Sequence, residues 1–174
     1  MNPKSRILVA LILGVCGCGY TTGAVLPNNI RTIYVEGFKN GISPETSQSY
    51  QLQPGVELDV TNKIINRYIF DGSLRIAHRE NADAVLEGTL VDYLKEPLRY
   101  AINDEDVEQY RLTLLVNMKL TDQRNGEVIF QESSFAGDTL YDTTGSRLKT
   151  EGAALIEAMD DLAKNIVDRT IENW

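Results

Sequence analysis

The segment from Tyr110 to Thr121 restricts the possible folds more than any other part of the chain. Alternation with a period of two indicates a strand that has one buried face and one face in water. Such one-sided burial is typical of an antiparallel sheet whose second side is covered by other elements. The apolar positions are Tyr110, Leu112, Leu114, Val116, Met118 and Leu120, and the interleaved ones are Arg111, Thr113, Leu115, Asn117, Lys119 and Thr121.

Strand patterns also occur before this segment. Residues 30–38 alternate and predict a first strand. Residues 84–94 are apolar on both faces, which is typical of a central strand, and residues 74–77 are a candidate short strand. Residues 39–54 are rich in Gly, Ser and Pro, so we interpret them as a loop.

A hairpin is expected after the long strand. The dipeptide Asn125-Gly126 favours a tight turn between two antiparallel strands. The returning strand is expected to run from Glu127 toward Tyr141, with a bulge near Ser133-Ser134 or Gly137.

Two segments have a helical period. Residues 55–70 predict a helix that ends at Asp71-Gly72, and residues 151–171 predict a longer one with Thr150 as its N-cap. Each helix has one apolar stripe, made of Val56, Val60, Ile64 and Tyr68 in the first and of Leu155, Met159, Leu162, Ile166 and Thr170 in the second.

The order of these elements predicts an α+β fold. We expect two helices packed on one face of a mostly antiparallel, mixed sheet of four to five strands, because each helical stripe must be buried against an apolar surface. Residues 30–174 are long enough to form one such domain with a core of its own.

The start of the chain predicts a leader and a lipid anchor. Lys4 and Arg6 precede an apolar run at residues 7–13, which is too short to span a bilayer core of about 30 Å. Small residues and then Cys18 follow, which resembles a bacterial lipobox. We therefore expect a signal peptide at residues 1–17, acylation of Cys18, and a tether at residues 18–29.

Cys16 and Cys18 also allow two other interpretations. A disulfide between cysteines one residue apart would close a strained loop. A metal site would need a second cysteine pair or a histidine cluster, and the sequence contains only two cysteines and one histidine. If cleavage precedes Cys18, the mature chain keeps one cysteine, and its stability must come from an ordinary hydrophobic core.

The charge of the chain restricts its partners. There are 25 acidic residues against 17 basic ones, and two of the basic residues precede Cys18. We expect no nucleic-acid partner, because binding phosphates needs a basic surface. The acidic chain would be repelled by an anionic surface, so membrane attachment is expected to depend on the N-terminal lipid.

No enzyme site is evident in the sequence. His78 has no nucleophile motif around it, and we interpret it as a surface residue. Residues 104–106 are acidic but lack the spacing and the glycine of a calcium loop, which favours a solvated hairpin tip. We therefore expect no enzyme, no cofactor and no metal.

Four basic residues are expected to meet at one end of the sheet. In an antiparallel meander, residues 95–106 and 140–149 lie opposite the Asn125-Gly126 turn. This places Lys95, Arg99, Arg147 and Lys149 together, as a site for a phosphorylated anionic ligand would require. The alternative is that these segments carry charges simply because they are loops.

With these residues placed, the chain resembles the LPS-assembly lipoprotein LptE family over its mature length. The resemblance depends on the order of several short motifs: Cys18-Gly19-Tyr20, Leu26-Pro27, Phe70-Asp71-Gly72, Ala82-Asp83-Ala84-Val85-Leu86-Glu87-Gly88, Glu108-Gln109-Tyr110-Arg111-Leu112, Gly126-Glu127-Val128-Ile129-Phe130 and Trp174. The chain departs from some members because it lacks a long polar C-terminal tail.

The resemblance implies a non-enzymatic lipoprotein on the periplasmic face of the outer membrane. Such a protein would plug the LptD β-barrel, help it assemble, and contact lipopolysaccharide during export. A polar strand face suits a polar barrel lumen, so we expect the partner surface to be Arg111, Thr113, an exposed Leu115, Asn117 and Lys119. The alternative is a lipoprotein regulator or secretion-pore subunit resembling LpoB or CsgG, which share the strand motif at residues 82–88.

Overall fold

The computed structural model describes residues 29–42, 54–102 and 106–172. The expected signal peptide, the acylated Cys18 and the tether up to residue 28 lie outside these residues. Most of the loop expected at residues 39–54 also lies outside them. No helix in the described ranges is long and apolar enough to cross a membrane.

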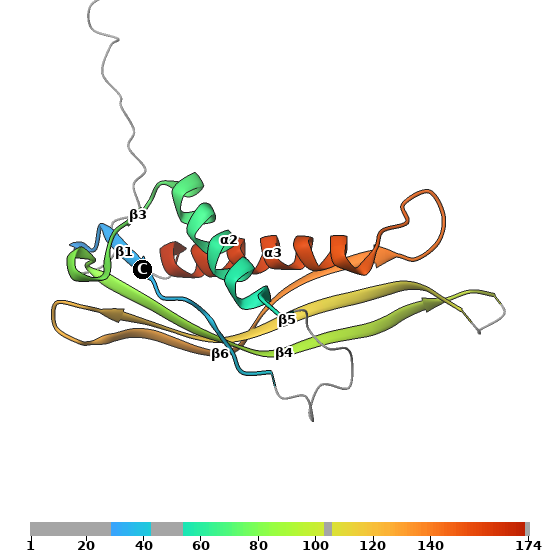
Figure 1. Ribbon diagram of the computed structural model, residues 1–174, viewed down its shortest axis with the longest axis horizontal. Helices are drawn as coiled ribbons and strands as arrows, with labels where there is room; N and C mark the ends of the chain where they lie inside the picture. The colour runs from blue at the N-terminus through green and yellow to red at the C-terminus, as the bar shows by residue number, and fades with distance from the viewer. Residues whose placement is uncertain (1–28, 43–53, 103–105, 173–174) are drawn as a thin grey trace, which may run out of the picture.

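An open, mixed sheet carries both helices on one of its faces (Figure 1). β1 pairs in parallel with both β3 and β4, whereas β4, β5 and β6 form an antiparallel meander. This confirms the predicted α+β class. The strand order is β3 (Arg75–Ile76), β1 (Thr32–Val35), β4 (Ala84–Tyr100), β5 (Val107–Asp122) and β6 (Val128–Asp142), and β2 (Lys39–Asn40) pairs with β4 beyond the end of β1.

Both helices begin and end close to the predicted residues. Helix α2 (Val56–Asp71) ends at Gly72, which has a φ of 77° and donates its N–H to the carbonyl oxygen of Tyr68 at 3.0 Å. A glycine adopts this left-handed conformation without a steric penalty. Helix α3 (Glu151–Glu172) begins after Thr150, whose hydroxyl accepts the N–H of Ala153 at 3.2 Å, which confirms the predicted N-cap.

The strand boundaries differ from the prediction in three places. The sequence predicts the first strand at residues 30–38, but β1 covers only Thr32–Val35. Lys39 and Asn40 form the short strand β2 rather than the beginning of a loop. Strand β4 continues past residue 94 as far as Tyr100, because its backbone pairs with β5 up to Val107. From Glu96 to Tyr100 the side chains of this extension are exposed, so no apolar pattern marks it as a strand.

The hairpin and the bulge occur where the sequence predicts them. Gly126 lies in the β5–β6 turn, where its N–H bonds to the carbonyl oxygen of Asp122 at 2.8 Å. The bulge is at Ser133-Ser134, where the register shifts opposite Asn117. Ser134 has a φ of 55° and donates its N–H to the side-chain oxygen of Asn117 at 2.9 Å. The unpaired backbone group of the bulge is thereby satisfied.

The core lies between the sheet and the helices. On β5 the predicted apolar positions face this core. All of them are buried except Tyr110, which lies near the beginning of the strand and is half-buried. Helix α3 contributes small residues as well as the predicted stripe, including Ala154, Ala158 and Ala163. One continuous hydrophobic cluster joins strand β1 and the meander of β4, β5 and β6 to both helices.

The sheet is longer than the helices that cover it. The 17 residues of β4 span about 56 Å at the usual rise of a strand, whereas the 22 residues of α3 span about 33 Å. The far part of the β4–β5 hairpin therefore projects beyond the helical layer (Figure 1). From Glu96 to Tyr100 the side chains are exposed.

Gly137 fixes the contact between β6 and α3. A Cβ built on Gly137 would collide with the backbone of Leu162. By contrast, a Cβ on Gly152, in the first turn of α3, meets nothing within 4 Å. The two glycines provide a matched pair of sites.

We predict that Gly137→Ala lowers the free energy of unfolding by about 1–3 kcal/mol, because α3 must move away from the sheet. Gly152→Ala should instead be neutral or raise it by about 0.5 kcal/mol, since alanine favours helix. Urea unfolding followed by circular dichroism measures both changes. Equal stability of the two variants would contradict the close packing at Gly137.

A second prediction concerns the buried contact between α2 and α3. The hydroxyl groups of Tyr68 and Thr170 are 2.8 Å apart, and both side chains are fully buried. Burial raises the pKa of Tyr68, so its hydroxyl stays protonated. Thr170→Val should lower the free energy of unfolding by about 1–3 kcal/mol, because a buried hydroxyl loses a partner.

The double variant Tyr68→Phe/Thr170→Val completes a mutant cycle for this pair. The double variant should lose less free energy of unfolding than Tyr68→Phe and Thr170→Val lose together. The reason is that it leaves neither hydroxyl without its partner. Strict additivity in urea unfolding would show that the two hydroxyls do not interact.

Candidate binding surfaces

One face of the sheet is not covered by any described element. Both helices pack on the opposite face (Figure 1). The cross-strand register places Glu87 beside Lys119 and Thr89 beside Asn117 on this uncovered face. It therefore carries the interleaved residues of β5 that the sequence assigned to a water-facing side.

The predicted partner residues Arg111, Thr113, Leu115, Asn117 and Lys119 all lie along this face. Arg111 and Asn117 are exposed, and Thr113 and Lys119 are half-buried. Leu115 is half-buried rather than exposed, because it lies between Asp92 and Ala136 of the neighbouring strands. The structure brings the five residues together as one row.

The charges of this row are paired across strands. Lys119 Nζ lies 2.8 Å from a carboxylate oxygen of Glu87, and Arg111 Nε lies 3.8 Å from one of Asp138. The hydrogen bond from Lys119 lowers the pKa of Glu87. Exposed pairs of this kind contribute little to stability, so these side chains can exchange their present partners for those of a bound molecule.

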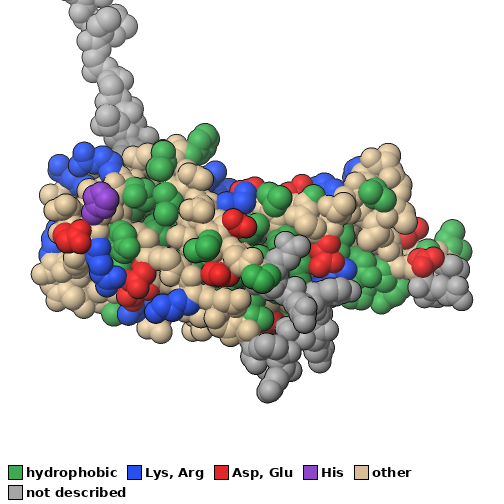
Figure 2. Space-filling view, in the orientation of Figure 1, with side chains coloured by type: hydrophobic (Ala, Val, Ile, Leu, Met, Phe, Trp, Pro, Cys, Tyr) green, Lys and Arg blue, Asp and Glu red, His purple; other side chains and the backbone are tan. Residues whose placement is uncertain are grey.

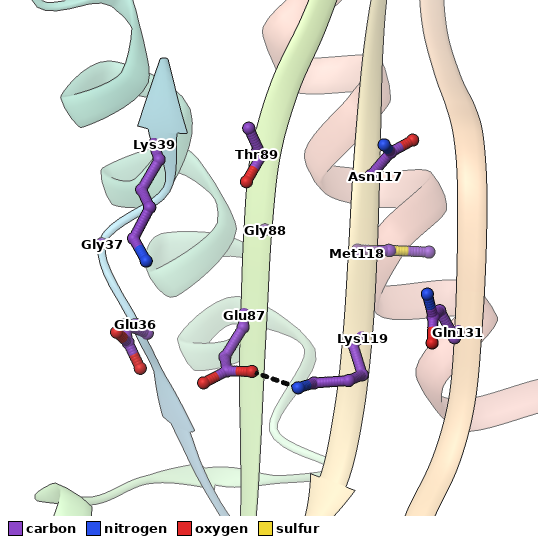
Figure 3. A pocket seen from close by; sticks show the side chains of 10 residues that line it. All are labelled: Glu36, Gly37, Lys39, Glu87, Gly88, Thr89, Asn117, Met118, Lys119 and Gln131. Atoms are coloured by element: carbon purple, nitrogen blue, oxygen red, sulfur yellow. Dashed lines mark ion pairs between the residues drawn. The ribbon is translucent and has the colours of Figure 1, made fainter. Parts of the chain in front are cut away.

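A shallow hollow of about 280 Å³ lies at the edge of this face. Figure 3 shows Glu36, Lys39, Glu87, Lys119 and Gln131 around it, with the helices behind the strands. Glu36 and Lys39 come from the segment that runs beside β4. Sequence reasoning missed them, because only the parallel pairing of β1 and β2 with β4 places them beside Glu87, the ion-pair partner of Lys119.

The four predicted basic residues lie at the opposite end from the Asn125-Gly126 turn. Lys95 and Arg99 lie on β4 rather than in a loop, and Arg147 and Lys149 lie between β6 and α3. A hollow of about 460 Å³ is lined at this end by Gln109, Leu140, Tyr141, Asp142, Arg147, Leu148 and Lys149.

Asp142 lies between two of these basic side chains. Its carboxylate oxygens are 3.5 Å from Arg99 and 3.5 Å from Arg147, and one of them also accepts a hydrogen bond from Gln109 at 2.8 Å. The Arg147 side chain is 82% exposed. Both guanidinium groups can therefore reach a ligand in solution while Asp142 holds them near each other.

Lys149 lies one residue before the N-cap of α3 and contacts Glu157. The Nζ–Oε1 distance is 2.6 Å, and this hydrogen bond, which exceeds the effect of burial, lowers the pKa of Glu157. The Glu157 carboxylate also accepts a hydrogen bond from Thr139 on β6 at 3.1 Å. Lys149 is half-buried, so part of its ammonium group remains available.

Lys95 is the least accessible of the four. It lies on the helix side of the sheet, opposite Leu112, and its side chain is only 12% exposed. Its Nζ is 2.7 Å from Glu151 and 4.4 Å from the ring centre of Tyr110. Burial alone would lower the pKa of Lys95, but the hydrogen bonds and charges of Glu151 and Tyr141 together outweigh burial and raise the pKa.

Sequence reasoning did not find the carboxylates that hold these basic residues. Asp142, Glu151 and Glu157 come from the end of β6 and the first turns of α3, and Glu108 of β5 lies 3.0 Å from Arg99 Nε. Nothing in their local sequence indicates a common location. Within the described ranges, no cluster of three or more histidine, cysteine or acidic residues has the arrangement of a metal site.

Comparisons with known proteins identify similar folds and a family. Among solved structures, the fold is similar to protein XCC0632 from Xanthomonas campestris, with a TM-score of 0.53 and 13% identity over 82% of this chain and 84% of that one. Protein CT253 from Chlamydia trachomatis gives a TM-score of 0.52 and 14% identity over 80% and 95%.

The PelC dodecamer from Paraburkholderia phytofirmans gives a TM-score of 0.49 and 15% identity over 82% of this chain and 90% of that one. At such identities a likeness shows the fold alone, and the PelC score is too low to add to it. None of the curated proteins matches the chain. The model of the LptE family, described as lipopolysaccharide-assembly, matches residues 30–170, which include all six described strands, α2 and all but the last two residues of α3. The chain therefore belongs to the LptE family of lipopolysaccharide-assembly lipoproteins.

Proposed function

We propose that this protein is anchored to the periplasmic face of the outer membrane by acylated Cys18. There it plugs the LptD β-barrel, assists its assembly and contacts lipopolysaccharide during export. The family match supports a role in lipopolysaccharide assembly. The observation that supports binding to the barrel is the uncovered face of the sheet. A domain that plugs a barrel needs a surface for the barrel wall that its own helices do not cover.

The uncovered face is suited to a barrel lumen. Interiors of outer-membrane barrels are polar, and alternate strand residues point into them. The row formed by Arg111, Thr113, Leu115, Asn117 and Lys119 offers charges and hydrogen-bond donors over the length of β5. Leu115 supplies a half-buried apolar contact within it.

The end of the sheet that carries Lys95, Arg99, Arg147 and Lys149, here called the basic end, is suited to the phosphates of lipopolysaccharide. Arg99 and Arg147 both contact Asp142, and a phosphate group with more negative charge can replace this carboxylate as their partner. Lys149 lies beside the same hollow. Lys95, held by Glu151, supports the site chiefly by keeping the end of β4 next to α3.

The first test of this proposal reverses a charge on the uncovered face. Lys119→Glu should lower the recovery of the barrel protein in detergent pull-downs about tenfold, since a lost charged contact costs about 1.5–3 kcal/mol. Lys164→Glu is the control, because Lys164 lies on α3, where it pairs only with Asp168 at 3.5 Å among the described residues.

The double variant Glu87→Lys/Lys119→Glu separates folding from recognition. It restores the internal ion pair with its polarity exchanged, so stability should return while barrel recovery stays low. Full recovery of the barrel would contradict recognition of Lys119. Co-purification of a cell-wall synthase in place of a barrel would favour the LpoB-like alternative.

The second test removes positive charge from the basic end. Arg99→Gln/Lys149→Gln should weaken binding to lipid A about tenfold or more, because two charge-assisted contacts are lost. Asp142→Asn should strengthen binding, since it removes the carboxylate that competes with phosphate for Arg99 and Arg147. Isothermal titration with lipid A in detergent measures both effects.

Unchanged affinity in Arg99→Gln/Lys149→Gln would show that the basic end does not bind lipid A. The matched control is Lys63→Gln, which removes a lysine paired with Asp160 on the helical layer. Its affinity for lipid A should equal that of the unaltered protein.

A further inference from the structure

Two neighbouring apolar side chains at the end of α2 point away from the core. Ile69 is 64% exposed and Phe70 is 81% exposed. The guanidinium carbon of Arg67 lies 5.5 Å from the centre of the Phe70 ring. Gly72 then turns the chain sharply into β3, so Ile69 and Phe70 form an apolar tip on the surface.

This tip lies close to the point where the described chain begins. β3 pairs with β1, and the N–H of Arg75 bonds to the carbonyl oxygen of Arg31 at 3.0 Å, two residues after Asn29. Cys18 precedes Asn29 by eleven residues. An extended segment of that length reaches at most about 37 Å. A lipid on Cys18 would therefore keep this end of the molecule near the bilayer.

Tyr100 and Leu148, which are also exposed, lie farther from the anchor, whereas Val128, 48% exposed at the start of β6, lies at the same end as β1. β1 pairs with the first residues of β4, whereas Tyr100 is the last residue of the same strand, about 56 Å away. Leu148, which is 59% exposed, lies at that distant end beside Asp142.

The surroundings of the tip are cationic although the chain is acidic. Between residues 67 and 79 there are three arginines and one acidic residue, Asp71. Arg79 pairs with Glu36, but neither Arg31 nor Arg75 forms an ion pair within the described residues. Figure 2 shows Lys and Arg side chains at the end formed by β1 and β3, with acidic side chains among them.

We propose that Ile69 and Phe70 insert into the interface of the bilayer leaflet that holds the anchor. Arg31 and Arg75 would lie at the phosphates of anionic phospholipids. This inference rests on the proposed acylation of Cys18 and adds an orientation: the β1–β3 end faces the membrane, and the basic end of the sheet points away from it.

A lipid surface fits this tip better than a protein partner. A stable protein interface needs about 800 Å² on each side, which two adjacent side chains do not provide. Interfacial membrane contacts use aromatic and aliphatic side chains flanked by basic residues, and they act as a second signal beside an acyl chain. Arg31 and Arg75, which form no ion pair within the described residues, supply positive charge that offsets the repulsion expected from the net charge.

The test places a fluorescent reporter at the tip of the full-length, processed protein. Trp174→Phe removes the one native tryptophan, and Phe70→Trp then introduces a single reporter. The protein is reconstituted into vesicles of phosphatidylcholine and phosphatidylglycerol whose acyl chains carry bromine, which quenches tryptophan. The control carries Leu148→Trp in the same background, because Leu148 is similarly exposed at the far end.

We expect the tryptophan at position 70 to be quenched at least about twofold more than the one at position 148. Adding Arg31→Gln/Arg75→Gln should reduce this quenching in vesicles with phosphatidylglycerol and leave it unchanged in neutral ones. Equal quenching at both positions would overturn the inference. A concentration-dependent shift of the position-70 emission without vesicles would also overturn it, in favour of contact between two copies.

Sedimentation of the vesicles distinguishes a failure of the proposed lipid anchor from a failure of this inference alone. A chain that stays in the supernatant after vesicle sedimentation, with an unmodified thiol at Cys18 by mass spectrometry, would overturn the proposed lipid anchor and this inference together. A chain that sediments with the vesicles but is quenched equally at both positions would overturn this inference alone.

Discussion

The packing of α3 against the edge strand β6 is the contact on which the rest of the structure depends. Gly137 allows the backbone of Leu162 to approach β6 more closely than any side chain would permit. Asp161 and Asn165 of α3 also bond to the edge of β6, through the N–H of Asp138 at 3.0 Å and the carbonyl oxygen of Ala136 at 3.3 Å. The helix therefore covers the core and also protects an open sheet edge.

Helix α2 covers the part of the same sheet face that α3 leaves open. It packs against α3 and β1, where Tyr68 and Thr170 share a buried hydrogen bond and Lys63 reaches Asp160. Both apolar stripes are then buried on the same side of the sheet. The consequence is a domain with two different faces, one closed by helices and one consisting of paired strands with polar side chains.

The excess length of the strands separates the molecule into two ends. Strand pairing continues beyond the helices because backbone hydrogen bonds do not require a buried face. The extended end carries Arg99, Arg147 and Lys149, each held by a carboxylate. Such pairing keeps long basic side chains in defined positions at little cost in stability, since exposed ion pairs contribute little. The β1–β3 end carries the first described residue and the apolar tip of α2.

The periodicity of the sequence determined the helices, the buried and exposed sides of β5, the hairpin at Asn125-Gly126 and the bulge at Ser133-Ser134, because each depends on residues that are close in the chain. Only the tertiary structure decided how far β4 extends, that Lys39-Asn40 joins the sheet, and which carboxylates hold Lys95, Arg99, Arg147 and Lys149. These features depend on contacts between segments tens of residues apart, and backbone pairing leaves no hydrophobic pattern where side chains remain exposed.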